Sequence, residues 1–303
     1  MKMRKFAPLA VTAAAGLVLA GCSSSEDTDT TAAATSGSDE AMAGGEITFG
    51  VFNGWDESVA SSLLWEAILE DKGYDVTLEY ADPAVTFQAL ADGDYDLVTD
   101  VWLPGTHASY LEEFGDDITE VGAWFDSAAL TVAVNADAPI DSLADLAANA
   151  DEFENRIVGI EPGAGLTAAV ENGIPTYGLE GMDFITSSTP AMLAELDSAM
   201  ADGENIVVTL WEPHWAYGAY DIKNLEDPEG ILGDAESIYT YSRNGFADEF
   251  ADVNEWMAGF TMESDLLYDL ENRLNAASGE SEYPEIVAEF IADNQEWVDS
   301  LTA

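Results

Sequence analysis

Basic residues are scarce in this sequence. Eight lysines and arginines stand against 60 aspartates and glutamates in 303 residues, so the formal net charge is −52. Three of the eight lie within the first five positions, which leaves five in the rest of the chain. A protein of this sign repels the phosphate backbone, so we expect no nucleic acid among its partners.

The acidic residues are distributed along the chain rather than gathered in blocks. This distribution favours a solvated acidic shell over the alternative, a binding surface for one large cation. Salt screens the repulsion within such a shell to within about 3 Å at 1 M ionic strength. We therefore predict a salt-loving source organism.

Cysteine and histidine are almost absent. Cys22 is the only cysteine, which excludes an internal disulfide, and the two histidines are His107 and His214. The sequence also lacks G-x-S-x-G, H-E-x-x-H, C-x-x-C and Walker motifs. We expect no catalytic residue, no metal site and no cofactor. An enzyme such as a hydrolase is therefore the least favoured class of function.

A long hydrophobic run occurs only at the N-terminus. Basic residues at positions 2, 4 and 5 precede an apolar run over 6–20, which is the order of a signal peptide. The run is too short to span a bilayer comfortably as a permanent helix. Residues 19–22, Leu-Ala-Gly-Cys, resemble the bacterial lipobox, which implies removal of residues 1–21 and lipidation of Cys22. The alternative is an ordinary secretory signal with an incidental cysteine.

The segment that follows the signal has few large apolar residues that could form a core. Residues 23–45 are rich in Ser, Thr, Asp, Glu, Ala and Gly, with no aromatic residue and no periodicity. Such a segment cannot bury enough apolar surface to offset the entropy of ordering, so we predict a disordered tether over 22–45. Residues 46–303 are long enough for one large or two small domains.

Strand and helix patterns alternate after the tether. Period-two or apolar runs predict strands over 46–52, 75–80, 95–102, 128–135, 156–160 and 206–211. Helical patterns occupy 59–69, 85–91, 140–146, a stretch from 167, 190–200 and much of the chain after 248. The alternation predicts an α/β fold with a parallel sheet. We expect a first lobe over 46–130, a second over 131–239, and a helical return to the first over 240–303.

A glycine motif follows the predicted strand 156–160. Residues 163–168 match the dinucleotide-binding pattern G-x-G-x-x-A, but they sit in the middle of the chain without the acidic residue that the fingerprint requires. Glycines at a helix N-terminus expose backbone N–H groups, which suits an anion as small as a carboxylate, here at Gly165. The alternative is a tight turn that binds no ligand.

Three tryptophans lie where predicted strands end, namely Trp55, Trp102 and Trp211. Ligands of open α/β sheets bind at the carboxyl ends of strands, whereas core aromatics more often lie within strands or on helix faces. Quaternary ammonium groups have no N–H to donate and are held by aromatic faces. Together with an anion site at Gly165, the three indoles predict a site for a zwitterion.

Five further motifs occur along the chain: Gly-Trp-Asp at 54–56, Gly-Asp-Tyr-Asp at 93–96, Val-Trp-Leu-Pro at 101–104, Gly-Ile-Glu-Pro-Gly-Ala-Gly at 159–165 and Trp-Glu-Pro-His-Trp at 211–215. Together they resemble the glycine betaine/proline betaine substrate-binding proteins of osmoprotectant ABC transporters. The resemblance covers 46–303 and implies a two-lobed type II periplasmic-binding-protein fold that closes by a hinge. Where an aspartate is common in the family the chain has Glu161, and where an isoleucine is common it has Leu166.

The same resemblance implies roles for particular residues. The family's aromatic prism falls on Trp55, Trp102 and Trp211, and its carboxylate clamp falls on the backbone N–H groups of Gly165 and Leu166 with the side chain of His107. It implies a monomeric extracytoplasmic receptor, lipid-anchored to the cell membrane, that passes glycine betaine to the permease and ATPase of an ABC transporter. A lipid-anchored sensor of quaternary amines and a receptor for choline, carnitine or proline betaine are the alternatives.

Overall fold

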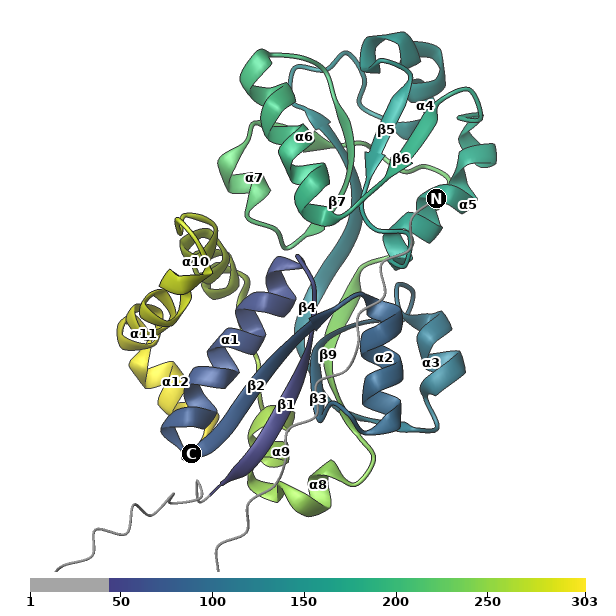
Figure 1. Ribbon diagram of the computed structural model, residues 1–303. Coiled ribbons are helices and arrows are strands. Elements are labelled where there is room, and N and C mark those ends of the chain that lie inside the picture. The colour runs from purple at the N-terminus through teal and green to yellow at the C-terminus, as the bar shows by residue number, and fades with distance from the viewer. Residues whose placement is uncertain (1–43) are drawn as a thin grey trace, which may run out of the picture. The chain divides into compact units, whose positions relative to one another are not determined.

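The computed structural model describes residues 44–303. The predicted signal peptide over 1–21, the lipidation site Cys22 and nearly all of the predicted tether over 22–45 lie outside the described residues. Within 44–303, the strands form one sheet in the order β2-β1-β3-β9-β4-β7-β5-β6, with β8 paired to β4. Two lobes share this sheet (Figure 1).

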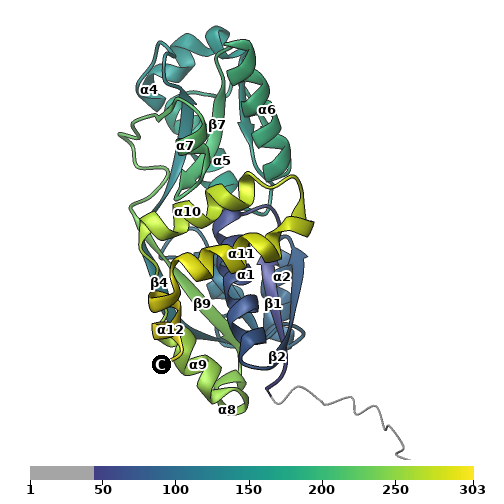
Figure 2. The same cartoon turned by 90° about the vertical axis from the view of Figure 1, so that its left-hand side faces the viewer.

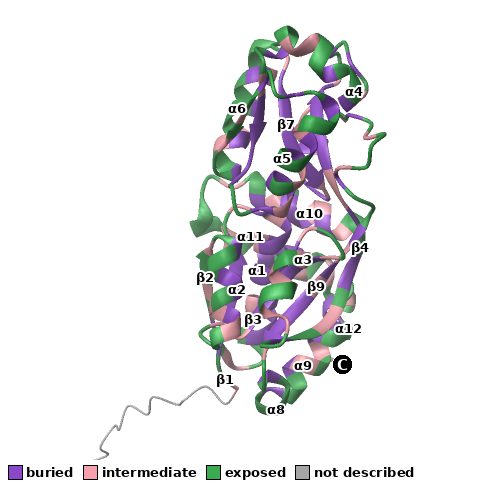
Figure 3. Cartoon of the chain, turned by 90° about the vertical axis from the view of Figure 1, so that its right-hand side faces the viewer, coloured by how far each residue is buried: buried purple, intermediate pink, exposed green. Residues whose placement is uncertain are grey.

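The first lobe begins with parallel strands that alternate with helices. β1 (Gly45–Phe52) pairs in parallel with β2 (Tyr74–Ala81) and β3 (Leu97–Leu103). The helices between and after them are α1 (Asp56–Asp71), α2 (Pro83–Asp92) and α3 (Ala108–Phe114). β3 is buried along nearly its whole length, and Figure 3 shows burial concentrated on the strands. The predicted β-α-β-α-β order of this lobe is confirmed.

The two lobes are joined through long antiparallel strands. β4 (Ile118–Asn135) pairs with β9 (Glu236–Arg243) as far as Ala128 and with β7 (Val207–Glu212) from Ala129 onward. The pairing changes partner next to Ser127, whose φ of 74° is unusual for a residue other than glycine. An all-parallel sheet is therefore wrong for this region, because β4 leaves the first lobe and β9 returns to it in the opposite direction.

The second lobe is a smaller α/β unit. Its strands are the second part of β4, β5 (Arg156–Gly159), β6 (Asp183–Thr186), β7 and β8 (Ile222–Asn224), and β5 pairs in parallel with β6 and β7. Its helical segments are α4 (Leu143–Leu146), the 3-10 helix η1 (Ala147–Phe153), α5 (Gly165–Tyr177), α6 (Thr189–Asp202) and α7 (Ala216–Ala219). Ser142 caps α4 by accepting from the N–H of Ala144.

The chain ends in helices that cover the first lobe. They are α8 (Phe246–Glu249), α9 (Ala251–Ala258), α10 (Ser264–Asn275), the 3-10 helix η2 (Glu280–Glu282), α11 (Tyr283–Asp293) and α12 (Gln295–Leu301). Helices α10 and α11 contact α1, and α9 contacts β4 (Figure 2). These contacts place the C-terminal helices on α1 and β4, whereas the predicted division into lobes over 46–130, 131–239 and 240–303 stays a prediction. None of the helices described in 44–303 is both long and apolar enough to cross a membrane.

Candidate ligand-binding site

The three predicted cage tryptophans meet at one cavity between the lobes. Trp55 follows β1, Trp102 lies near the end of β3, and Trp211 lies near the end of β7. Together they line a space of about 260 Å³ and are at most 5 % exposed. The other residues along the cavity wall are Glu57, Thr106, Leu130, Ile160, Ala164 and Leu166. None of the lysines and arginines in the described part of the chain lines the cavity.

Each cage indole is fixed through its N–H group. Trp102 Nε1 donates to Asp100 Oδ1 at 2.7 Å, two residues back along β3. The indoles of Trp55 and Trp211 likewise donate to buried carboxyl groups. Because the polar edge of each ring is occupied, the ring can contribute only its aromatic surface to the cavity.

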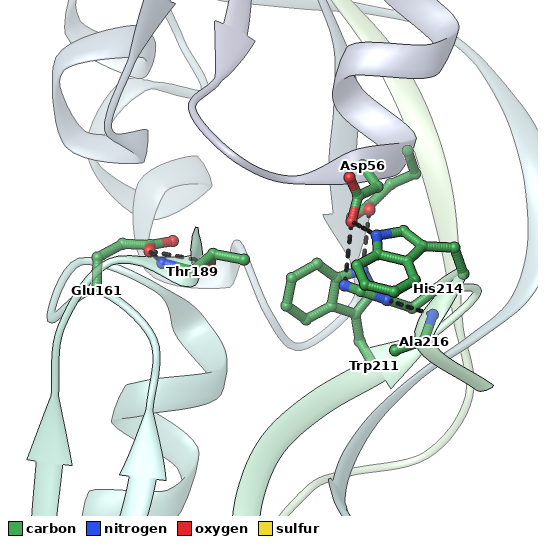
Figure 4. Close-up of polar contacts among 8 residues, drawn as sticks. Asp56, Glu161, Thr189, Trp211, His214 and Ala216 are labelled. Carbon is green, nitrogen blue, oxygen red and sulfur yellow. Dashed lines mark hydrogen bonds and ion pairs between the residues drawn. The ribbon is translucent and has the colours of Figure 1, made fainter. Parts of the chain in front are cut away.

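Two of these bonds cross between the lobes in opposite directions. Trp55 of the first lobe donates to Glu161 of the second, and Trp211 of the second lobe donates to Glu57 of the first at 2.8 Å. Glu161 is itself held by the backbone N–H and the hydroxyl of Thr189, both at 3.1 Å (Figure 4). Each lobe therefore positions an indole that belongs to the other.

A third contact across the lobes lies beside the cage. Asp56, the first residue of α1, accepts a hydrogen bond from Trp215 Nε1 at 2.8 Å, and the same oxygen lies 3.1 Å from His214 Nε2 (Figure 4). His214 Nδ1 accepts from the N–H of Ala216, which places the ring hydrogen on Nε2. Burial lowers the pKa of His214 to about 3, so this contact is made by a neutral ring.

The backbones of the two lobes approach closely at Gly165. A Cβ atom at this position would lie 2.2 Å from the carbonyl oxygen of Thr106 in the first lobe. Thr106 has little freedom to withdraw, because the carboxylate of Glu236 accepts from its N–H, from its hydroxyl and from the N–H of Gly105. Only glycine fits at position 165 when the lobes are in this arrangement.

The N-terminus of α5 offers backbone donors beside the cage. The helix begins at Gly165, and its N-cap residue, Ala164, has no side chain that could accept from the first N–H groups. Those groups have no partner within the helix, and the helix dipole favours an anion near them. Ala164 and Leu166 line the cavity, whereas Gly165 lines a neighbouring space beside Thr106, so the role of the Gly165 and Leu166 N–H groups in binding stays a prediction.

His107 lies behind the cavity wall rather than on it. Its ring stacks on that of Trp55, with centroids 5.7 Å apart and planes 6° from parallel. Its Nδ1 accepts from the backbone N–H of Trp102 at 2.9 Å, and burial lowers the pKa of His107 to about 3, so the ring is neutral. The remaining hydrogen is on Nε2, which has no hydrogen-bond partner within 44–303. The geometry shows support for Trp55, and the predicted contact with a ligand carboxylate stays a prediction.

Buried carboxyl groups gather around the indoles, and sequence reasoning missed them. Glu57, Asp100 and Glu271 are at most 1 % exposed, and both carboxyl oxygens of Glu271 lack a hydrogen-bond partner within the described chain. Burial, with repulsion from neighbouring acids, raises the pKa of Glu57 to about 8 and those of Asp100 and Glu271 well above their usual range. The one signal in the sequence was the placement of acids next to cage tryptophans, as at 55–57 and 100–102.

The two histidines of the described chain take part in packing and in backbone hydrogen bonds. Both are neutral and buried, and each uses Nδ1 to accept a backbone N–H. Within 44–303 no group of three or more His, Cys, Asp or Glu residues is placed to hold a metal ion. The cavity itself combines aromatic walls with Ala164 and Leu166 from the start of α5.

Comparison with known proteins assigns this chain to a family. The family model described as the substrate binding domain of ABC-type glycine betaine transport system matches residues 45–293. The glycine betaine/carnitine transport binding protein GbuC of Listeria monocytogenes is 40% identical over 114 residues, an alignment that spans 37% of this chain and 37% of GbuC.

Two solved structures are similar over nearly the whole described chain. The glycine betaine/L-proline-binding protein ProX of Borrelia burgdorferi has a TM-score of 0.80 at 30% identity, over 85% of this chain and 97% of that one. Lactococcal OpuAC, in a closed complex with glycine betaine, has a TM-score of 0.78 at 29% identity, over 85% of this chain and 99% of that one. The fold is that of the type II periplasmic binding proteins. The chain belongs to the family of substrate-binding domains of ABC-type glycine betaine transport systems.

Proposed function

We propose that this protein is a receptor that captures glycine betaine between its lobes and delivers it to the permease of an ABC transporter. The observation that carries the proposal is the cavity walled by Trp55, Trp102 and Trp211, one from the end of each of three strands. The cavity is small and the three indoles that wall it are at most 5 % exposed, which suits a ligand of few heavy atoms.

The cationic end of the ligand would lie among the indoles. A trimethylammonium group cannot donate a hydrogen bond, and aromatic faces attract it with about 0.5 to 2 kcal/mol each. The rings of Trp55 and Trp211 are 6.2 Å apart between centroids and inclined by 49°, so they form two non-parallel walls. Trp102 supplies a third wall. A rounded cation fits such walls better than a flat ring would.

The carboxylate end of the ligand would lie at the N-terminus of α5. We expect it to accept from the N–H groups of Gly165 and Leu166, which have no partner within the helix. His107 Nε2 as a third donor stays a prediction. A zwitterion with a carboxylate is favoured over choline on this basis, because choline has no anion to place at these donors.

Delivery requires that the receptor stays near the membrane and changes shape on binding. We infer that Cys22 carries the lipid and that the tether over 22–45 raises the concentration of the monomeric receptor beside the permease and ATPase. The bonds of Trp55 and Trp211 would form only when the lobes close, so the closed form differs from the open one on the surface presented to the permease. A sensor would use the same site, and neighbouring genes for an ATPase and a permease would favour the receptor.

Isothermal titration calorimetry with glycine betaine, proline betaine, carnitine and choline tests the proposal. We expect the tightest binding for glycine betaine and weaker binding for choline, because choline leaves the α5 donors without an anion. Failure of all four ligands to bind would overturn the proposed function. A preference for choline would retain the aromatic cage but overturn the role of Gly165 and Leu166.

A further inference from the structure

Among residues 44–303, Glu57 is the one acidic residue on the wall of the cavity. It is the second residue of α1, directly after the turn that positions Trp55, and its side chain is 1 % exposed. The remaining lining residues carry no formal charge. Any charge in the wall of this cavity therefore comes from Glu57.

The carboxyl group of Glu57 has a hydrogen-bond donor but no cation. Its Oε2 accepts from Trp211 Nε1 at 2.8 Å. The ion pairs formed among residues 44–303 do not include Glu57, and its acidic neighbours are Asp56 on the same helix, Asp100 on β3 and Glu271 on α10. Burying a carboxylate without an opposite charge is costly, so the site is arranged for a positive charge that the protein does not provide.

We propose that Glu57 is the counter-charge for the quaternary ammonium group of the ligand and determines the selection of a cation over a neutral group of the same shape. The inference rests on the proposed function and adds a second source of selectivity to the indoles. The aromatic faces fit any rounded methylated group, whereas a carboxylate in the wall attracts only a group that carries positive charge. Shape and charge would thus be recognised by different residues.

A pair of ligands separates the two contributions. Tert-butylacetate has the shape and the carboxylate of glycine betaine, with carbon in place of the charged nitrogen. Glu57→Gln removes the charge from the wall but keeps a side-chain oxygen that can accept from Trp211. Titrations are run above pH 8, because burial raises the pKa of Glu57 to about 8 and the carboxyl must be ionised.

We expect Glu57→Gln to weaken glycine betaine binding by about tenfold or more and to leave tert-butylacetate binding unchanged or tighter. The dissociation constant for tert-butylacetate divided by that for glycine betaine would then fall at least tenfold. Glu57→Asp keeps the charge, so it should keep most of the ratio even if both ligands bind more weakly. Glu66→Gln makes the same change on α1 away from the cavity and should alter neither constant.

The outcomes distinguish the inference from the proposed function. An unchanged ratio in folded Glu57→Gln, with both ligands affected equally or not at all, overturns the counter-charge role while leaving the receptor function intact. A similar fall of this ratio in Glu57→Asp, which keeps the charge, would show that selectivity depends on side-chain length. That result would also overturn the counter-charge role. Absence of glycine betaine binding to the unaltered protein would instead overturn the proposed function.

Discussion

Gly165→Ala is expected to weaken glycine betaine binding by about 100-fold or more, because it removes the closed arrangement from the accessible states. The added methyl group would lie 2.2 Å from the carbonyl oxygen of Thr106 and 2.8 Å from its Cγ2 atom. Glu236 holds Thr106 in place through hydrogen bonds to the N–H and the hydroxyl, so the lobes must separate instead. Titration calorimetry measures the loss.

Gly163→Ala is the matched control for this change. It lies two residues earlier in the same loop, and its added methyl group would come no closer than 3.7 Å, to the hydroxyl of Tyr110. We expect its affinity to stay within about threefold of the unaltered protein. Both variants should melt at nearly the same temperature, because the open form has room for either methyl group. Equal affinities for Gly165→Ala and the unaltered protein would show that closure does not bring Gly165 against Thr106.

Trp102→Ala is the second large effect, with an expected loss of about 100-fold in glycine betaine affinity. The substitution removes one wall of the cavity, and with it the attraction between the ring and the cation and the apolar surface that excludes water. It also leaves Asp100 without the indole donor that holds it at 2.7 Å. Titration calorimetry measures the affinity, and thermal melting by circular dichroism verifies that the variant folds.

Two phenylalanine variants separate binding from stability. Trp102→Phe keeps an aromatic face in the cavity and should lose less affinity than Trp102→Ala. Trp65→Phe changes a tryptophan in the core of the first lobe, where the centroid of its ring lies 5.4 Å from that of Phe260. The Nε1 atom of Trp65 has no hydrogen-bond partner within 44–303. We expect Trp65→Phe to leave the affinity unchanged. Unchanged affinity in folded Trp102→Ala would mean that this indole belongs to the core rather than to the site.

The placement of the cage could be predicted because it depends on a general property of α/β sheets. Trp55, Trp102 and Trp211 each come where a strand ends, and strand ends were visible as the points where apolar runs stop. Their meeting at one cavity then follows from the sheet order, which brings β1, β3 and β7 toward the junction of the lobes. The family resemblance added Leu166, which also lines the cavity.

The antiparallel joint between the lobes was harder to predict. β9 begins at Glu236 and alternates buried with half-buried residues, whereas β3 is buried along nearly its whole length, so the strand character of β9 was not apparent. The four residues of β6 are too few for a periodic pattern. Both strands are defined by their neighbours in the sheet, which a local pattern does not contain.

The polar partners of the indoles could not be predicted for a different reason. In a chain with 60 acidic residues, the type of residue does not distinguish Glu57 from an exposed glutamate such as Glu70. What makes Glu57 different is its contact with Trp211, which is 154 residues away in the sequence. The position of His107 behind Trp55 is equally a product of tertiary packing.

A crystal structure of the unaltered protein with glycine betaine is the most direct test of the site. We expect the trimethylammonium group among Trp55, Trp102 and Trp211, within about 6 Å of the ring centroids, and the carboxylate at the N–H groups of Gly165 and Leu166. Glycine betaine bound elsewhere, or bound in this cavity with its ends reversed, would contradict the account.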